Sequence, residues 1–296
     1  MLPVVVTIAT LAIGCVLYGI FIERFRYRVV RHRLDILPAG APPLDVLHLS
    51  DLHFVRRDPR KTRFLSGLPS ADVTIVTGDF LGEPDAVETT VESARAVRGR
   101  IGSWFVLGSN DYFVPRPLNY LAYFRGPRRR RKVTLGRAGD LIRGLVADGW
   151  DDLTDSRRPM SLAGLETELL GLDDAHIDRH DLRVAPRSDE HRFGIAVMHS
   201  PDSAPEAAAL GYELIVAGHT HGGQVRLPIA GALVTNCSMP RRLVSGLIRM
   251  GSATLHTSPG LGTSKFAPFR FFCRPEATIL EMSQTGSRDR SVSASR

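Results

Sequence analysis

Cysteine is scarce in this sequence. Only three occur among the 296 residues, Cys15, Cys237 and Cys273, and no two of them form a C-x-x-C pair. This spacing predicts neither a zinc knuckle nor a disulfide framework, and it permits a reducing compartment. The fold must therefore depend on a hydrophobic core. Hydrophobic residues make up 43% of the chain, which is enough for one large domain or two small ones.

Charge is absent from the first segment of the chain. No charged side chain occurs between Leu2 and Ile22, and Glu23 is the first one. About 20 apolar residues suffice to cross a bilayer as a helix. A secretory signal peptide would need a basic start and a small-residue cleavage site, and neither is present. The segment therefore predicts a single-pass membrane anchor rather than a cleaved signal or a buried core helix.

Basic residues follow this segment, whereas none precedes it. The first five are Arg24, Arg26, Arg28, Arg31 and Arg33. By the positive-inside rule, this asymmetry places the following domain in the cytoplasm. The arginines would also attract anionic lipid head groups. We therefore predict a cell-membrane protein whose main domain lies on the cytoplasmic face.

Composition divides the chain into four parts. Residues 1–23 are the predicted anchor, and residues 24–43 are a basic juxtamembrane linker that ends in a Pro- and Gly-rich stretch. Residues 44–282 form the main domain. Residues 283–296 lack large apolar side chains and are predicted to be a disordered tail.

The main domain alternates buried strands with helical segments, which is typical of an α/β fold. Apolar strand patterns begin at residues 46, 72, 103, 192 and 213, a strand pair is expected over 160–172, and short strands over 254–257 and 277–281. Helical spacing occurs over residues 58–68, 84–98 and 139–150. In such folds, functional residues gather at the carboxyl ends of the strands.

Polar side chains follow five of these strands. They are Asp51 with His53, Asp79, Asn110 with Asp111, His199, and His219 with His221. Asp51 and His53 are two residues apart, so an extended backbone would point both toward one side. Imidazole, carboxylate and amide ligands together suit Mn, Fe or Zn better than Ca. Because seven or eight ligands exceed the need of one ion, the pattern predicts two divalent ions.

The order of these motifs resembles that of a known family. D-x-H, G-D, G-N-H-[DE], a lone H and G-H-x-H follow one another in calcineurin-like metallophosphoesterases. The longer strings HLSDLH, MHSPD, GHTHGGQVRLP and GLGTS are similar to the membrane-anchored bacterial phosphodiesterase branch. The resemblance covers residues 44–282. It implies a four-layer αββα sandwich with a dinuclear metal site.

The resemblance also implies metal-binding roles. Asp51, His53 and His221 would hold one ion, Asp79 would bridge both, and Asn110, His199 and His219 would hold the second ion. Our predicted catalytic residues are Asn110, Asp111 and His219, with Asp111 or a metal-bound water supplying a proton to the leaving group.

One motif departs from the family pattern. G-N-H-D reads Gly108-Ser109-Asn110-Asp111 in this chain. An ungapped alignment puts Ser109 at the position of the metal-binding amide, and a one-residue slip leaves that role to Asn110. We prefer the slip, because an amide oxygen is a better ligand than a neutral hydroxyl. In both alignments the family histidine is missing, and the resemblance implies that this histidine assists the leaving group. Without it we predict better turnover of esters with acidic leaving groups, which need no proton to depart.

The predicted function is hydrolysis of a phosphodiester, pyrophosphate or phosphomonoester, lipid-linked or nucleotide-linked, by a hydroxide that bridges the two ions. An alternative is a membrane-associated nuclease or nucleic-acid-binding protein that uses the basic run between Arg128 and Lys132, although we rank nucleic acid below lipid. A non-catalytic scaffold is a third hypothesis.

Asp173 and His176 are predicted substrate contacts at the rim. His48 is predicted to be buried behind the site, and His256 to be structural.

Overall fold

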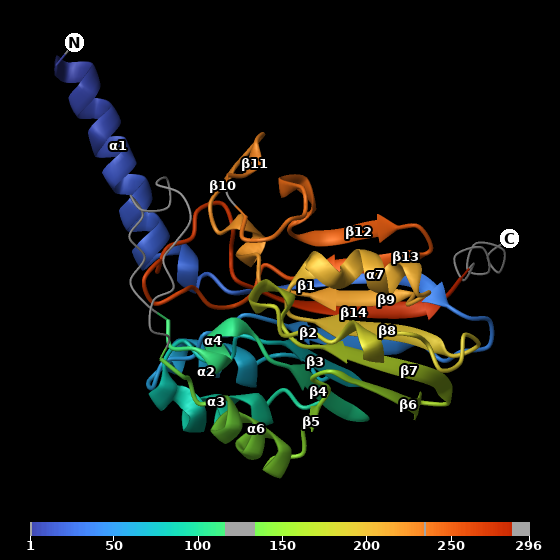
Figure 1. The fold of residues 1–296 in the computed structure, drawn as a ribbon. Helices are drawn as coiled ribbons and strands as arrows, with labels where there is room; N and C mark the ends of the chain where they lie inside the picture. The colour runs from blue at the N-terminus through green and yellow to red at the C-terminus, as the bar shows by residue number, and fades with distance from the viewer. Residues whose placement is uncertain (1, 116–133, 234, 286–296) are drawn as a thin grey trace, which may run out of the picture.

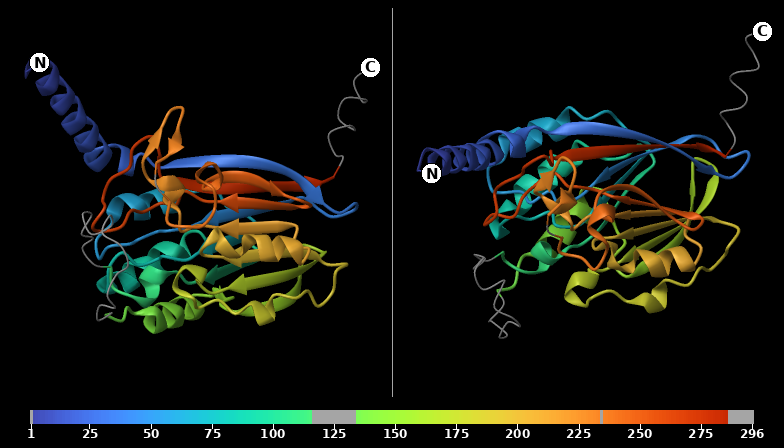
Figure 2. Two further views of the ribbon diagram at one scale, coloured as in Figure 1. Left: turned by 45° about the horizontal axis from the view of Figure 1, so that its top comes forward. Right: turned by 90° about the horizontal axis from the view of Figure 1, so that it is seen from above.

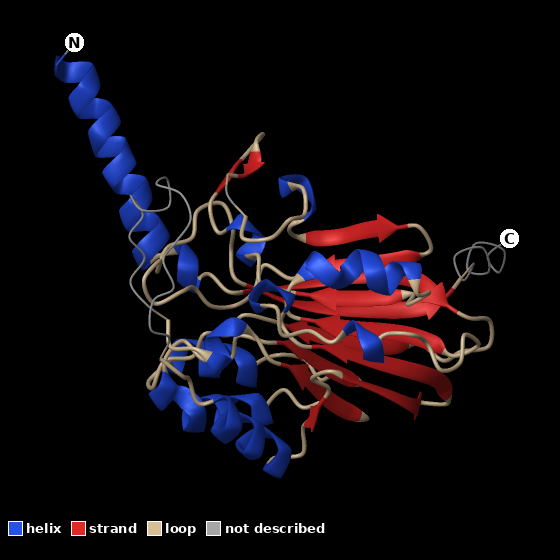
Figure 3. Ribbon diagram, viewed as in Figure 1, coloured by secondary structure: helices blue, strands red, loops and turns tan. Residues whose placement is uncertain are grey.

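The structure is a computed structural model that describes residues 2–115, 134–233 and 235–285. Two six-stranded sheets lie face to face within this part of the chain. Figure 1 shows them stacked, and Figure 3 shows helices and loops around the strands. The basic run at 125–132 lies outside the described residues.

The first sheet is built around three parallel strands. β2 (Leu44–Leu49), β3 (Val73–Thr77) and β4 (Gly102–Val106) are adjacent. The full order is β1 (Arg28–Leu37), β14 (Glu276–Gln284), β2, β3, β4 and β5 (Asp151–Asp152). β2, β3 and β4 read as continuous apolar runs because both faces of this sheet are covered.

The second sheet supplies the other half of the core. Its order is β12 (Gly246–Met250), β13 (Ala253–Thr257), β9 (Leu214–Ala217), β8 (Phe193–Met198), β7 (Leu165–Leu172) and β6 (Ser156–Leu162). Val46 and Ile75 of the first sheet belong to one buried cluster with Ile195 and Val216 of the second. This cluster is the central layer of the fold.

Helices cover the outer face of each sheet. Leu65 of α2 (Pro59–Ser66), Ala94 of α3 (Val87–Arg95) and Leu141 of α6 (Ala138–Ala147) belong to the core cluster outside the first sheet. Ala207 of α7 (Ala204–Ala209) belongs to the corresponding cluster outside the second. The predicted four-layer αββα sandwich is therefore confirmed.

The juxtamembrane segment differs from the prediction. Residues 28–37 of the predicted linker form β1, which runs parallel to β14 from Arg28 opposite Glu276 onward. Arg28 and Arg31 form ion pairs of 2.7 Å with Glu276 and Glu281. These partners lie about 250 positions away, so local composition could not reveal the strand. β14 also extends to Gln284, and residues 286–296 of the predicted tail lie outside the described part.

The apolar N-terminal helix projects from the body of the molecule, as both views in Figure 2 show. α1 spans Leu2–Phe21, and the hydrophobic stretch that contains it has a mean hydropathy of 2.4 with 6% of its residues buried. Among the described residues, its last turns make the contacts with the domain. The Tyr18 ring lies 6.5 Å from that of Phe271, and the Arg270 N–H donates to the Gly19 carbonyl. Its length and composition are those of a membrane span.

Candidate metal centre

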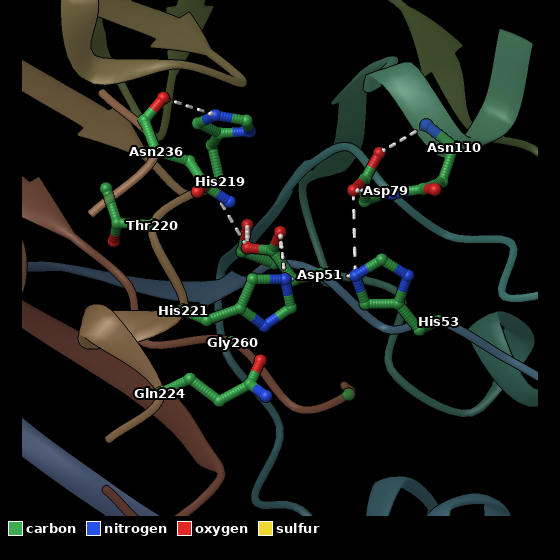
Figure 4. Close-up of polar contacts among 12 residues, drawn as sticks. Asp51, His53, Asp79, Asn110, His219, Thr220, His221, Gln224, Asn236 and Gly260 are labelled. Carbon is green, nitrogen blue, oxygen red and sulfur yellow. Dashed lines mark hydrogen bonds and ion pairs between the residues drawn. The ribbon is translucent and has the colours of Figure 1, made fainter. Parts of the chain in front are cut away.

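Four strand ends of the two sheets converge on one buried site. Asp51 and His53 follow β2, and Asp79 follows β3. His199 follows β8, while His219 and His221 follow β9. All six side chains are buried. In Figure 4 the His53 ring faces Asp79 and the His221 ring faces Asp51, whereas the His219 ring faces the carbonyl of Asn236. The structure thus brings together all six residues from two different sheets.

The side chains form two overlapping groups of possible ligands. Donor atoms of Asp51, His53 and His221 lie within 4.8 Å of one another, and so do those of Asp51, Asp79 and His199. Asp51 belongs to both groups. Asp79 lies 3.6 Å from Nε2 of His53 through one oxygen and 3.6 Å from Nε2 of His199 through the other. A carboxylate thus lies between the two groups, as a two-ion site requires.

The donor atoms fit divalent cations. Nε2 of His53 and Nε2 of His221 face each other at 3.1 Å, and Oδ1 of Asp51 is buried without a hydrogen bond among the described residues. A buried acceptor without a partner costs about 1–3 kcal/mol. A cation between these atoms would satisfy both the nitrogens and the oxygen. Two imidazole groups with shared carboxylates suit Mn, Fe or Zn.

The backbone at these positions is strained. Asp51, His53, Asp79, His219 and His221 all have positive φ, between 42° and 66°. Non-glycine residues rarely adopt this region, and each such residue costs of order 1–3 kcal/mol. The prediction that an extended strand aligns Asp51 and His53 is therefore wrong, because β2 ends at Leu49. A left-handed turn aims the two side chains instead.

Glycine permits the close approach of the strand ends. Gly78 has a φ of +83°, and a Cβ at this position would lie 2.6 Å from the backbone nitrogen of Gly108. A Cβ on Gly108 would in turn lie 2.4 Å from the Asp79 carboxylate. Any side chain at either position would push the β3 and β4 ends apart.

The carboxylates create a site that favours positive charge. Burial opposes protonation of His199, but Asp79, Asp174 and Asp51 outweigh it and raise the pKa of His199 to about 10. Burial likewise opposes ionisation of Asp79, yet His199, His53 and two hydrogen bonds from Asn110 lower its pKa. Burial lowers the pKa of His53 to about 4, so that imidazole is neutral. The carboxylates that stabilise a proton on His199 would stabilise a metal cation at the same place.

Asn110 contacts the predicted bridging residue. In α4 (Ser109–Tyr112), the Asn110 backbone N–H and its side-chain amide donate to the two oxygens of Asp79, at 2.8 and 2.5 Å. Asp111 has a different environment. Its carboxylate accepts the backbone N–H groups of Leu81 and Gly108, both at 3.0 Å, and is fully buried. Burial and the nearby Asp79 raise the pKa of Asp111 to about 8.

The rim residues divide into structural and site-facing groups. Oδ2 of Asp173 accepts the Tyr112 hydroxyl and the Arg179 guanidinium, both at 2.9 Å, and Oδ1 accepts the Asp174 backbone N–H at 2.8 Å. Protein groups thus already use both oxygens, and the substrate contact predicted for Asp173 stays a prediction. The exposed His176 ring lies 4.3 Å from the ring of His219, which keeps it available at the rim.

Sequence reasoning gave too little weight to Asp174. Its Oδ2 is buried without a hydrogen bond among the described residues, and its charge contributes to the raised pKa of His199. Asn236 was also missed. Its carbonyl lies 3.3 Å from Nε2 of His219, which leaves Nδ1 of that ring 3.2 Å from His199. Asp174 was overlooked because the substrate contact was assigned to the neighbouring Asp173. Asn236 was overlooked because it belongs to no recognisable motif.

The sequence comparison settles the family. Residues 44–223, more than half of the chain, match the pattern of the calcineurin-like phosphoesterases. The chain belongs to this family. The family uses a dinuclear metal centre, and the clustered Asp and His residues form its binding site here. The chain is therefore a metal-dependent phosphoric ester hydrolase.

Several relatives match over most of their length. The uncharacterized metallophosphoesterase YkuE of Bacillus subtilis is 23% identical, with 90% of both chains covered. Phosphodiesterase YaeI of Escherichia coli is 25% identical, with 86% of this chain and 88% of YaeI covered. A crystal structure of phosphopantetheinyl hydrolase from Mycobacterium tuberculosis aligns with a TM-score of 0.44 and 13% identity, covering 73% of this chain and 89% of the other.

Proposed function

We propose that the protein is a membrane-anchored phosphoesterase whose substrate carries a lipid or another anionic group beside the scissile phosphate. The single observation that supports this most is the position of a basic pocket. The pocket, of about 390 Å³, includes His53 of the metal centre and Arg24 and Phe25, which follow the apolar helix. One cavity therefore connects the reacting centre with the membrane-proximal segment.

The charges of this pocket favour an anion. Five of its lining residues are basic, namely Arg24, Arg57, Arg60, Lys61 and Lys265. Among the described residues that line it, Asp58 is the sole carboxylate, and it forms an ion pair of 2.7 Å with Lys61. Lys265 pairs with Glu83 at 2.9 Å. The charges of Arg24, Arg57 and Arg60 remain, and this excess of positive charge suits a phosphate-bearing head group. A larger hollow of about 700 Å³ beside α3 contains none of the predicted ligands, so we assign the substrate to the smaller one.

Membrane anchoring rests on α1 and on the direction of charge. A bovine relative named transmembrane protein with metallophosphoesterase domain is 28% identical over 82% of this chain and 54% of its own length. By the positive-inside rule, the arginines after α1 support a cytoplasmic position for the domain. However, Arg28, Arg31 and Arg33 pair with Glu276 and Glu281 of β14. Of the five arginines that follow α1, Arg24 and Arg26 would therefore provide the attraction to anionic lipid head groups.

The residues of the centre have separable tasks. Asp51, His53 and His221 would hold one ion, and Asn110, His199 and His219 the other, with Asp79 between them. Bound ions would supply an activated water and neutralise charge on the phosphoryl oxygens. Asn110 holds both oxygens of Asp79 and so fixes that carboxylate. We assign the ligand role to the amide oxygen of Asn110 rather than to Ser109, because an amide oxygen is a better ligand than a neutral hydroxyl.

The test uses the full-length chain in detergent with Mn, Zn or Fe. We expect hydrolysis of phosphodiesters or lipid pyrophosphates, and loss of roughly 10³-fold in rate for Asp79→Asn. Asp85→Asn, an exposed acid outside the site, is the matched control. Equal rates for Asp79→Asn and wild type would contradict the assignment of the centre.

The lipid part of the proposal has its own experiment. Removing Arg57 and Arg60 together should raise KM about tenfold for a lipid-linked substrate and leave a small aryl diester unchanged. Arg63 lies on α2 with Arg60, but it is exposed and does not line the pocket. Its removal provides the control. Equal effects on both substrates would remove the pocket from the proposal. The nucleic-acid alternative depends on residues 128–132, and no observation on the described residues favours it.

A further inference from the structure

A second histidine cluster lies between the two sheets. His32 of β1, His48 of β2 and His256 of β13 point into the inter-sheet space, together with Glu276 at the start of β14. Donor atoms of His32, His256 and Glu276 lie within 4.8 Å of one another. None of these residues belongs to the groups formed by the strand ends. The cluster is thus a separate set of possible ligands.

The hydrogen bonds of this cluster leave one nitrogen without a partner. Nδ1 of His48 lies 2.7 Å from Nδ1 of His256, and Nε2 of His48 lies 3.0 Å from Oγ1 of Thr77. Nε2 of His256 is fully buried and has no hydrogen bond among the described residues. Buried polar atoms without partners are rare and point to an unseen ligand.

The direction of these hydrogen bonds identifies the chemistry of that ligand. The two Nδ1 atoms at 2.7 Å can share only one proton. If His256 donates it, His48 can donate from Nε2 to Thr77, whose hydroxyl reaches the Leu49 carbonyl at 3.5 Å. Every proton in this series of hydrogen bonds then has an acceptor, and Nε2 of His256 presents a free lone pair. A ring whose other nitrogen donates a hydrogen bond is the usual arrangement for a metal-binding histidine.

We propose that His32, His256 and Glu276 bind a third divalent transition-metal ion, such as Zn²⁺, that links the two sheets. Two imidazoles with a carboxylate suit such an ion, with water completing its coordination. Glu276 keeps lone pairs for this role, because Thr278 and Arg28 use only part of the capacity of its two oxygens. His32 is half-buried on β1, an edge strand, which gives the ion an entry path.

The position of the site suggests what the ion would stabilise. β1 follows the apolar helix, and β13 leads into residues 258–262. In that loop the Leu261 and Gly262 N–H groups donate to the carbonyls of Ser50 and Asp51. An ion held by both strands would therefore tie the membrane-proximal strand to the loop that supports the metal centre.

Metal analysis of full-length variants in detergent tests this proposal. Asp51→Asn with Asp79→Asn removes the carboxylates of both strand-end groups. This variant should still retain one equivalent of Zn²⁺ or Co²⁺ after dialysis, with visible Co²⁺ absorption bands. Adding His256→Gln should abolish that equivalent, whereas adding His191→Gln, an exposed histidine, should not.

Thermal unfolding provides a second readout. Zn²⁺ at about a hundred times its Kd should raise the Tm of the double variant by roughly 5–10 °C. The shift should vanish with His256→Gln or, if that variant does not fold, with the half-buried His32→Gln. A double variant that holds no ion, or a full equivalent retained by both histidine variants, would overturn the third site.

Discussion

The two histidine clusters differ in the backbone that carries them. In the metal centre, five of the six Asp and His residues lie beyond strand ends with left-handed φ values, packed against glycines. His32, His48 and His256 lie within regular strands, and none of them has a positive φ. Ligands on strained turns can crowd together from several strands, whereas ligands within strands can only link neighbouring layers. We therefore expect the first arrangement to serve catalysis and the second to serve stability.

The largest expected effect separates these two roles directly. Asp51→Asn should lower the metal-dependent rate by roughly 10³-fold, because it removes the carboxylate shared by both ligand groups. The free energy of unfolding of the metal-free protein should fall by less than about 1 kcal/mol, since burial already raises the pKa of Asp51 and disfavours its charge. Initial rates and urea unfolding in EDTA measure the two quantities.

His48→Asn is the matching test for the histidine cluster within the strands. It should leave the rate per folded molecule within about fivefold of wild type, yet lower the unfolding free energy by roughly 2–3 kcal/mol, because His256 and Thr77 lose their buried partner. A rate loss as large as that of Asp51→Asn would erase the distinction between the clusters.

Gly78→Ala tests the crowding of the strand ends. We expect it to lower the unfolding free energy by about 3 kcal/mol, from left-handed strain together with the contact to Gly108. Gly211→Ala is a close control, because Gly211 has a φ of +85° but no atom within 4 Å of an added Cβ. Urea unfolding of both variants isolates the contact, and equal losses would show that strain alone matters.

Asp111→Asn asks whether the buried carboxylate is catalytic or structural. An amide would present an N–H₂ group to one of the two backbone N–H donors, so stability should fall by about 1–3 kcal/mol. The rate of the folded fraction should change less than tenfold. A loss of 10³-fold with folding intact would instead support the predicted role of Asp111 in catalysis.

The smallest expected effect concerns the missing family histidine. Wild type should hydrolyse aryl diesters faster than alkyl diesters, because no imidazole follows the predicted amide ligand to protonate the leaving group. Combining Ser109→Asn with Asn110→His moves the amide to position 109 and restores the family's Asn-His order of the ungapped alignment, which should narrow this ratio by at least about tenfold. Ser109→Asn alone is the control, and an unchanged ratio in the double variant would exclude the leaving-group explanation.

Sequence reasoning found the strand ends because each motif is local. DVTIVTGD, for example, contains both a buried strand and its polar end. It missed β1, whose arginines pair with glutamates of the distant β14. It also misjudged the geometry of Asp51 and His53, because a left-handed turn at non-glycine residues has no composition signal. His256 likewise looked isolated, since its partners His32 and His48 are more than 200 positions away.

The pairing of β1 with β14 also limits how far the catalytic site can move. Only residues 22–27 separate α1 from β1, and three of them form a short 3-10 helix. With α1 in a bilayer, this connection is too short to act as a tether. The enzyme would stay at a nearly fixed height above the lipid, so it would meet a lipid-linked substrate of the proposed kind by diffusion of that substrate within the membrane plane.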